Sequence, residues 1–195
     1  MKKRISTTYL CYVALMIALS TILSYFPEIP LAFFAPWLKL DFSFVPMLLI
    51  GFSFGPGASI LALVITNIVH LLGSTTGGVG ELANTFVGAA YLLPPTLIYV
   101  RHRNKKAAII GTAIGALLMV AVAILTNKYL LVPALLGEKI AGFDMTGYLI
   151  AGILPFNLIK GFMNSLITFL LYKHLSRFIK EINCKEYART GNRNC

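Results

Sequence analysis

Long apolar stretches, separated by short polar segments, dominate the chain. A helix of roughly 20 apolar residues crosses a bilayer, and several of the stretches approach that length. We predict six membrane-spanning helices, at about residues 8–27, 44–55, 58–73, 81–100, 107–127 and 148–173. The second is short and bounded by proline and glycine, so hydropathy alone could merge it with the third across GFSFGPG (51–57).

Composition favours an integral membrane protein. The chain has 195 residues, of which 57% are hydrophobic and 12% are charged. A soluble domain of this length needs a larger charged surface. We therefore predict an all-α protein with a single six-helix membrane domain over 1–180, followed by a polar C-terminal tail over 181–195.

The distribution of charge predicts the orientation of these helices. Basic residues gather in MKKR at the start, in RHRNKK (101–106) and from Lys173 onward, and these groups hold 13 of the 17 Lys and Arg residues. Cytoplasmic segments of membrane proteins carry an excess of Lys and Arg. An even number of spans must then precede residue 101, which places both termini in the cytoplasm and a long loop (27–46) outside. The alternative is a cleaved signal peptide after MKKR, which would put the mature N-terminus outside.

The sequence carries no motif for nucleotide or metal chemistry. G-x-x-x-x-G-K-[ST], H-E-x-x-H and aspartate-rich pairs are all absent, and GSTTGGVGE (73–81) lacks the lysine of a phosphate-binding loop. The cysteines Cys11, Cys184 and Cys195 have no metal-ligand spacing. The net charge of +10 comes from groups at helix ends, where they meet anionic lipid. We expect no enzyme, no metal or other cofactor, and no nucleic-acid partner.

A polar stripe lies on the sixth predicted span. Asn157, Lys160 and Asn164 are spaced i, i+3 and i+7, so they share one helical face. Lys160 precedes Lys173 by 13 residues, which puts it roughly 20 Å from the cytoplasmic end of the helix. A charge at that depth costs about 2.5–3.5 kcal/mol and normally faces a cavity or a partner. Two alternatives stay open: the lysine could reach outward from an external helix end, and the asparagines could serve only to join helices.

The fifth span adds Asn127 near its external end. If the fifth and sixth spans pack antiparallel, Asn127, Asn157 and Lys160 converge in the outer half of the bundle. Two amides and an ammonium offer several donors and two amide acceptors, which suits a neutral planar ligand with ring carbonyls and an imide N–H. The lysine argues against a metal ion at this place.

The external loop 27–46 is rich in aromatic residues, which could cover a flat ring by stacking or form an interfacial belt. These residues are Phe33, Phe34, Trp37, Phe42 and Phe44. Lys39 and Asp41, two residues apart in the same loop, could pair with each other.

Four segments together resemble a known family. They are LKLDFSFVPMLL (38–49), TGGVGELANTFVGAAYLLP (76–94), TNKYLLVP (126–133) and PFNLIKGFMNSL (155–166). In this order they are similar to the riboflavin-binding S component (RibU type) of energy-coupling factor (ECF) transporters, and the likeness runs through residues 8–176. The resemblance implies a multi-pass protein of the bacterial cell membrane that captures riboflavin from outside, with the external loop over the ligand.

The resemblance also implies site residues and partners. Asn127, Asn157 and Lys160 match the family's flavin-contacting positions, and Glu81 or Asn84 would meet the ribityl chain. The full expected substrate-binding set is Asn127, Asn157, Lys160, Leu40, Asp41, Phe34, Glu81, Asn84 and Asn164. Ala14 and Ala18 match an Ala-x-x-x-Ala motif of the first helix, where small residues let a partner helix approach closely. The partners implied are a transmembrane coupling subunit and two ATPase subunits. Phe44 departs from the family pattern, because many relatives carry an acid there.

Two other functions remain open. The same fold could hold another vitamin, such as thiamine, biotin or a folate, although Lys160 would repel cationic thiamine. A non-transporting helical bundle is the other alternative, and it would need neither an aromatic lid nor a polar stripe at cavity depth.

Overall fold

The chain folds into a bundle of helices. The structure, a computed structural model, describes residues 7–26, 29–30 and 38–189. The α-helices are α1 (Thr7–Tyr25), α2 (Phe44–Phe54), α3 (Pro56–His70), α4 (Val79–His102), α5 (Lys105–Thr126), α6 (Val132–Leu136), α7 (Met145–Gly147) and α8 (Leu154–Arg189). Short 3-10 helices η1 (Leu71–Gly73) and η3 (Gly137–Gly142), π-helices η2 (Asn127–Leu131) and η4 (Tyr148–Ile153), and strands β1 (Ile29–Pro30) and β2 (Lys39–Leu40) complete it.

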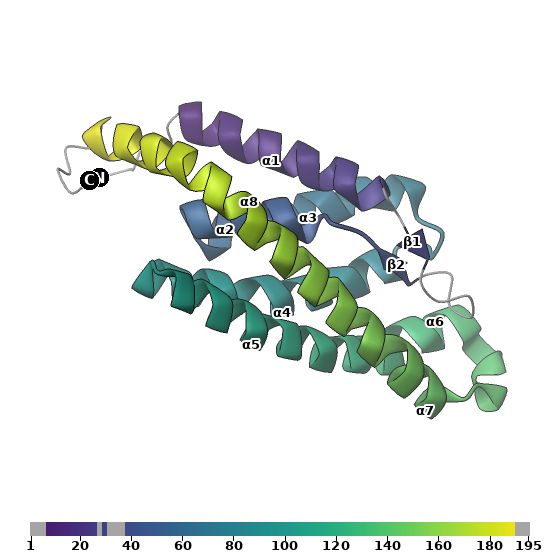
Figure 1. The fold of residues 1–195 in the computed structure, drawn as a ribbon. Coiled ribbons are helices and arrows are strands. Elements are labelled where there is room, and N and C mark those ends of the chain that lie inside the picture. Colours follow the sequence, from purple (N-terminus) through teal and green to yellow (C-terminus); the bar gives the residue numbers. More distant parts are fainter. Residues whose placement is uncertain (1–6, 27–28, 31–37, 190–195) are drawn as a thin grey trace.

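The bundle has two distinct ends. The start of α1, the connection between α4 and α5, and the end of α8 lie together at one end, on the left of Figure 1. The antiparallel pair β1–β2 and the short helices α6 and α7 lie at the other end. The α4–α5 connection, which carries RHRNKK (101–106), therefore lies at the same end as the last part of α8.

The split between the second and third predicted spans is confirmed. Gly55 has a φ of 93°, in the left-handed region that glycine adopts at little cost, and Pro56 follows at the first turn of α3. These two residues end α2 and begin α3. Residues Phe44 through Phe52 of α2 are all buried, as is typical of a helix that is hydrophobic on every side.

Helices α4 and α5 pack closely because glycines face the contact. A Cβ atom on Gly111 would lie 2.5 Å from Pro95 Cα, and one on Gly115 would lie 2.4 Å from the backbone oxygen of Tyr91. Small residues four apart allow this approach between helices in membranes. The Tyr91 hydroxyl also donates to the carbonyl of Gly161, at 3.1 Å, and so ties α4 to α8.

Three helical segments of the described chain are long and apolar enough to cross a membrane. They are Pro56–Gly73, Lys105–Leu136 and Met145–Leu171, whereas Tyr9–Tyr25 and Phe44–Phe54 are shorter apolar helices. The all-helical prediction is confirmed apart from the two-residue strands.

Two predicted boundaries differ from the structure. Helical structure continues past the predicted end at 127 through η2, α6 and η3 to Gly142, and α8 runs to Arg189, into the segment predicted as a polar tail. Hydropathy reports where a helix is apolar, but it does not report where the helix stops.

Candidate functional site

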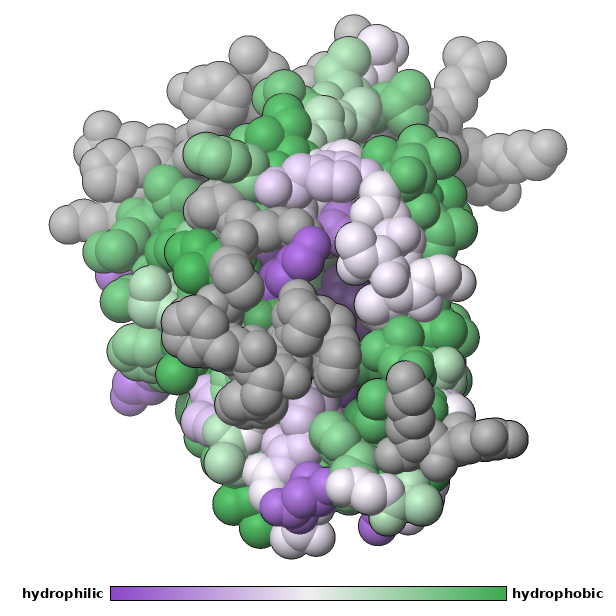
Figure 2. Space-filling model, turned by 90° about the vertical axis from the view of Figure 1, so that its right-hand side faces the viewer, coloured by the Kyte–Doolittle hydropathy of each residue, from purple (hydrophilic) through white to green (hydrophobic). Residues whose placement is uncertain are grey.

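A polar cavity of about 140 Å³ opens at the end of the bundle that carries β1 and β2. Figure 2 looks at this end and shows hydrophilic atoms, in purple, near its centre, beside pale residues of intermediate hydropathy, with apolar green surface farther out. Elements far apart in the sequence contribute to it. The lining residues are Ser24, Leu38, Lys39, Asp41, Asn67, His70, Gly73, Thr75, Thr76, Gly80, Glu81, Ala83, Asn84, Val87, Ala123, Asn127, Leu131, Phe156, Asn157 and Lys160.

Lys160 points into this cavity and is only 5% exposed. Its Nζ lies 2.7 Å from Asp41 Oδ2 and 4.8 Å from the centroid of the Phe44 ring. An opposite charge and an aromatic face both stabilise a buried ammonium. The prediction that Lys160 faces inward is confirmed. Asp41 thus forms an ion pair with Lys160 of α8, a residue 119 positions away in the sequence.

Asn164 anchors the loop that carries Asp41. Its Nδ2 donates to the backbone oxygen of Asp41, at 3.1 Å, and to that of Lys160, at 2.9 Å. Asn164 is fully buried and does not line the cavity. Asp41 Oδ1 in turn accepts from the backbone N–H of Ser43 at 3.0 Å. The sequence placed Asn164 on the correct face of α8, but its amide group bonds to the backbone of this loop and of α8 itself.

Asn127 and Asn157 lie on the same cavity as Lys160, because α5 and α8 pack against each other. Asn127 Nδ2 donates to the Ala123 carbonyl and Asn157 Nδ2 donates to the Ile153 carbonyl, both at 2.8 Å. Asn127 and Asn157 are 6% and 4% exposed. The expected convergence of these three side chains is what the structure shows.

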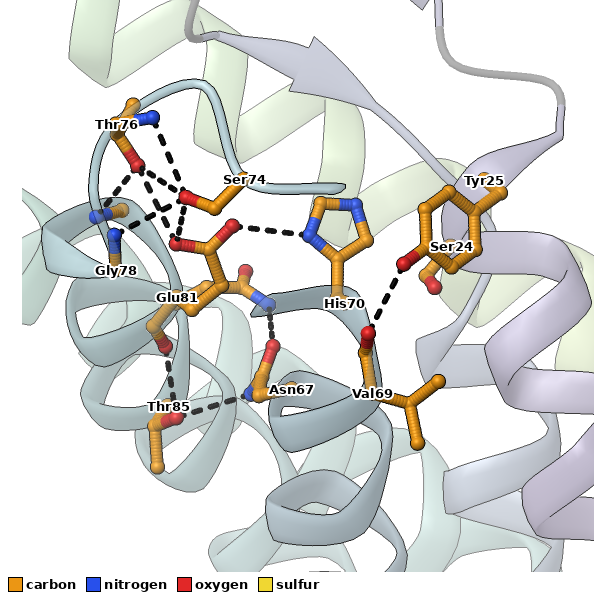
Figure 3. A network of polar contacts seen from close by, with 12 residues as sticks. Ser24, Tyr25, Asn67, Val69, His70, Ser74, Thr76, Gly78, Glu81 and Thr85 are labelled. Atoms are coloured by element: carbon orange, nitrogen blue, oxygen red, sulfur yellow. Dashed lines mark hydrogen bonds and ion pairs between the residues drawn. The ribbon is translucent and has the colours of Figure 1, made fainter. Parts of the chain in front are cut away.

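A second polar group, the Glu81 network, lines another part of the cavity (Figure 3). Glu81 Oε1 lies 3.1 Å from His70 Nδ1, while Glu81 Oε2 accepts from Ser74 Oγ at 2.8 Å and from Thr76 Oγ1 at 3.3 Å. The ring of His70 also stacks on Tyr25, with centroids 4.8 Å apart. The glycine-rich loop is thus tied to the start of α4 through one carboxylate.

Asn84 belongs to the same region. Its Nδ2 donates to Asn67 Oδ1 at 2.9 Å, and Asn67 Nδ2 donates to Thr85 Oγ1 at 3.0 Å. Sequence reasoning selected Glu81 and Asn84 but missed the lining residues Asn67, His70 and Thr76. For Asn67 and His70, the spacing could have indicated a shared site, because they lie three residues apart at the end of α3, on the face toward α4.

The remaining predicted residues fall into three groups. Leu40 is buried but does not line this cavity, although its neighbours do. Phe34 lies outside the described residues. Ala14 and Ala18 are exposed on α1.

The family of the chain follows from comparison with known proteins. The family model described as "ECF transporter, substrate-specific component" matches residues 8–172. The chain belongs to this family.

Two relatives and a solved structure give more detail. The riboflavin transporter RibU of Staphylococcus aureus (strain TCH60) is 36% identical over 174 residues, which is 87% of this chain and 91% of that protein. The riboflavin transporter FmnP of Bacillus subtilis (strain 168) is 29% identical over 163 residues, 80% of this chain and 83% of that protein. A solved structure entitled "Structure and mechanism of the S component of a bacterial ECF transporter" superposes with a TM-score of 0.75 at 36% identity, covering 88% of this chain and 97% of that one.

Proposed function

We propose that this chain is the substrate-binding membrane subunit of an ECF transporter and captures riboflavin from outside a bacterial cell. Its family membership and the names of its relatives support the transporter class and the ligand. The observation that carries the ligand assignment is the buried Lys160 in a cavity with Asn127 and Asn157. In this proposal riboflavin is the transported cargo.

The hydrogen bonds within the site leave a donor–acceptor pattern that suits the pyrimidine edge of an isoalloxazine ring. Asn127 uses one of its two amide hydrogens on Ala123 and keeps the other. Asn157 Oδ1 has no hydrogen-bond partner among the described residues. Lys160 directs one of its three hydrogens to Asp41. Asn127 and Lys160 can therefore each donate to one carbonyl of the flavin, and Asn157 Oδ1 can accept from the imide N–H between these carbonyls.

The Glu81 network is the proposed place for the ribityl chain. Glu81 and Asn84 line the same cavity as Lys160. Carboxylate and amide groups that are already held by neighbours can accept from or donate to hydroxyl groups without first being ordered.

We further propose that six helices span the membrane and that the end formed by the start of α1, the α4–α5 connection and the end of α8 is cytoplasmic. In the sequence, the three basic segments precede α1, form the α4–α5 connection, and begin within α8, in accord with the excess of Lys and Arg on the cytoplasmic side. The cavity then opens outward, toward the substrate. The short helix α2 is one of the six, and it is too short to cross the roughly 30 Å apolar core alone. Because Phe44 through Phe52 are buried, most of α2 meets protein and not lipid.

The proposed partners are a transmembrane coupling subunit and two ATPase subunits that supply the energy of uptake. Ala14 and Ala18 form an exposed small-residue surface on α1, which allows close helix approach. We expect Ala14→Leu combined with Ala18→Leu to abolish co-purification with the coupling subunit and to leave riboflavin binding unchanged. Ala113→Leu, on an exposed position of α5, is the matched control.

Titration of the purified protein with riboflavin tests the ligand assignment. Binding should quench flavin fluorescence in a saturable way, and protein from rich medium should be yellow. Thiamine and biotin should not compete. Colourless protein and a linear, unsaturable fluorescence titration would overturn the assignment and favour another vitamin or a non-transporting bundle.

A further inference from the structure

Asn127 is held by a second residue that does not line the cavity. The hydroxyl of Tyr148 donates to Asn127 Oδ1 at 2.8 Å, and both side chains are buried. Asn127 is the first residue of the π-helix η2, which follows α5, and Tyr148 is the first residue of the π-helix η4, which precedes α8. The hydrogen bond therefore joins the two π-helices. The Tyr148 ring also packs edge-on against Phe143, with centroids 5.3 Å apart.

These contacts fix which way the amide of Asn127 points. An asparagine amide carries an acceptor and a donor of nearly the same shape, so an unsupported one can turn over. Here the Ala123 carbonyl can only accept, and it receives Asn127 Nδ2 at 2.8 Å. Turning the amide over would set two oxygens against each other at Ala123, and the Tyr148 hydroxyl could no longer donate to Asn127 Oδ1. The amide therefore presents its remaining N–H, and not its oxygen, to the cavity.

We propose that Tyr148 is a positioning residue of the binding site, which acts through Asn127 to make this part of the site a hydrogen-bond donor. The inference rests on the proposed function, because it concerns which ligands the same cavity selects. The site then favours ligands with a carbonyl oxygen or an unprotonated ring nitrogen opposite Asn127. A ligand with an N–H at that place is rejected, since two donors would meet in a buried setting.

A double-mutant cycle on riboflavin affinity tests this role. The variants are Tyr148→Phe, which keeps the ring and its contact with Phe143, Asn127→Ala, and the two combined. We expect affinity to fall about threefold to tenfold for Tyr148→Phe, the size of one lost hydrogen bond, and at least about tenfold for Asn127→Ala. The combined variant should bind within about twofold of Asn127→Ala, because a residue that acts through Asn127 has nothing left to position.

Tyr91→Phe is the matched control. Tyr91 is also a buried tyrosine, and its hydroxyl bonds to Ser165 Oγ at 2.7 Å, away from Asn127. Its loss should lower the temperature of unfolding without weakening riboflavin binding. The melting temperature of each variant, measured without ligand, reports that it is folded.

The outcomes separate this inference from the proposed function. Wild-type protein that binds no riboflavin overturns both. Wild-type protein that binds, together with a Tyr148→Phe variant of unchanged affinity, overturns the role of Tyr148 alone. Losses that multiply in the combined variant also overturn it, since Tyr148 would then act independently of Asn127.

Discussion

The cavity has two polar regions that are built in different ways. Around Lys160, the contacts join residues that are far apart in the chain: the bond to Asp41 spans 119 positions, and the bond from Asn164 to Asp41 spans 123. In the Glu81 network, the bonds to His70 and Ser74 span only 11 and 7 positions. The first region forms only when the whole bundle closes, whereas the second needs little more than α3, α4 and the loop between them.

This difference predicts how each region responds to mutation. Damage around Lys160 should affect both affinity and global stability, because the same contacts hold the segment that carries Asp41 against α8. Mutations in the Glu81 network should have a local effect: they should lower riboflavin affinity more than they lower the free energy of unfolding.

The largest effect is expected for Lys160→Ala. Removing the ammonium leaves the buried carboxylate of Asp41 without its partner, which costs about 3–5 kcal/mol of unfolding free energy. Riboflavin affinity should fall at least about tenfold, which corresponds to roughly 1.4 kcal/mol. Chemical denaturation and fluorescence titration measure the two quantities.

The paired variant Asp41→Asn with Lys160→Ala is the control for the first prediction. It removes both charges, so most of the lost stability should return while affinity remains low. Full recovery of affinity in this variant would contradict a direct role for Lys160 at the ligand.

The next largest effect is expected for Asn164→Ala. Two hydrogen bonds to the backbone of Asp41 and Lys160 are lost, each worth about 0.5–1.5 kcal/mol. Affinity should fall several-fold, although Asn164 does not line the cavity, because Asp41 is no longer held in place. Thr112→Val is the matched control, since Thr112 is equally buried but bonds only to carbonyls of its own helix. Equal affinity in the two variants would show that the loop anchor is irrelevant to binding.

A smaller and more local effect is expected for Glu81→Gln. The amide keeps an oxygen for Ser74 but loses the charge that strengthens the bonds from His70 and Thr76. Riboflavin affinity should fall about threefold to tenfold, and unfolding free energy should change by less than about 1 kcal/mol. Asp144→Asn, an exposed helix cap away from the cavity, is the control. A loss of stability as large as that of Lys160→Ala would erase the distinction between the two regions.

The contrast also explains how much the sequence could predict. Apolar stretches and the Gly55–Pro56 break identified the principal helices, because hydropathy and backbone chemistry are local properties. The stripe on the sixth span identified the face of α8 that meets the cavity for the same reason. The ion pair of Asp41 with Lys160 was not predicted, because the sequence suggested only the neighbouring Lys39 as a partner and does not show that Asp41 packs against α8. Tyr148 was missed because a tyrosine in an apolar stretch has many possible uses.

The smallest effect is expected for Ser74→Ala. The Ser74 hydroxyl donates to Glu81 Oε2 and accepts from the backbone N–H of Gly78 at 3.1 Å, so its loss loosens the loop without removing a charge. Affinity should fall no more than about threefold, and amide hydrogen exchange across residues 74–80 should become faster while exchange in α8 stays the same. Leu72→Ala, at an exposed position of η1 that does not line the cavity, should change neither quantity. Faster exchange in α8 after Ser74→Ala would mean that the local network also supports the long-range one, and the two regions would then have to be treated as a single cooperative unit.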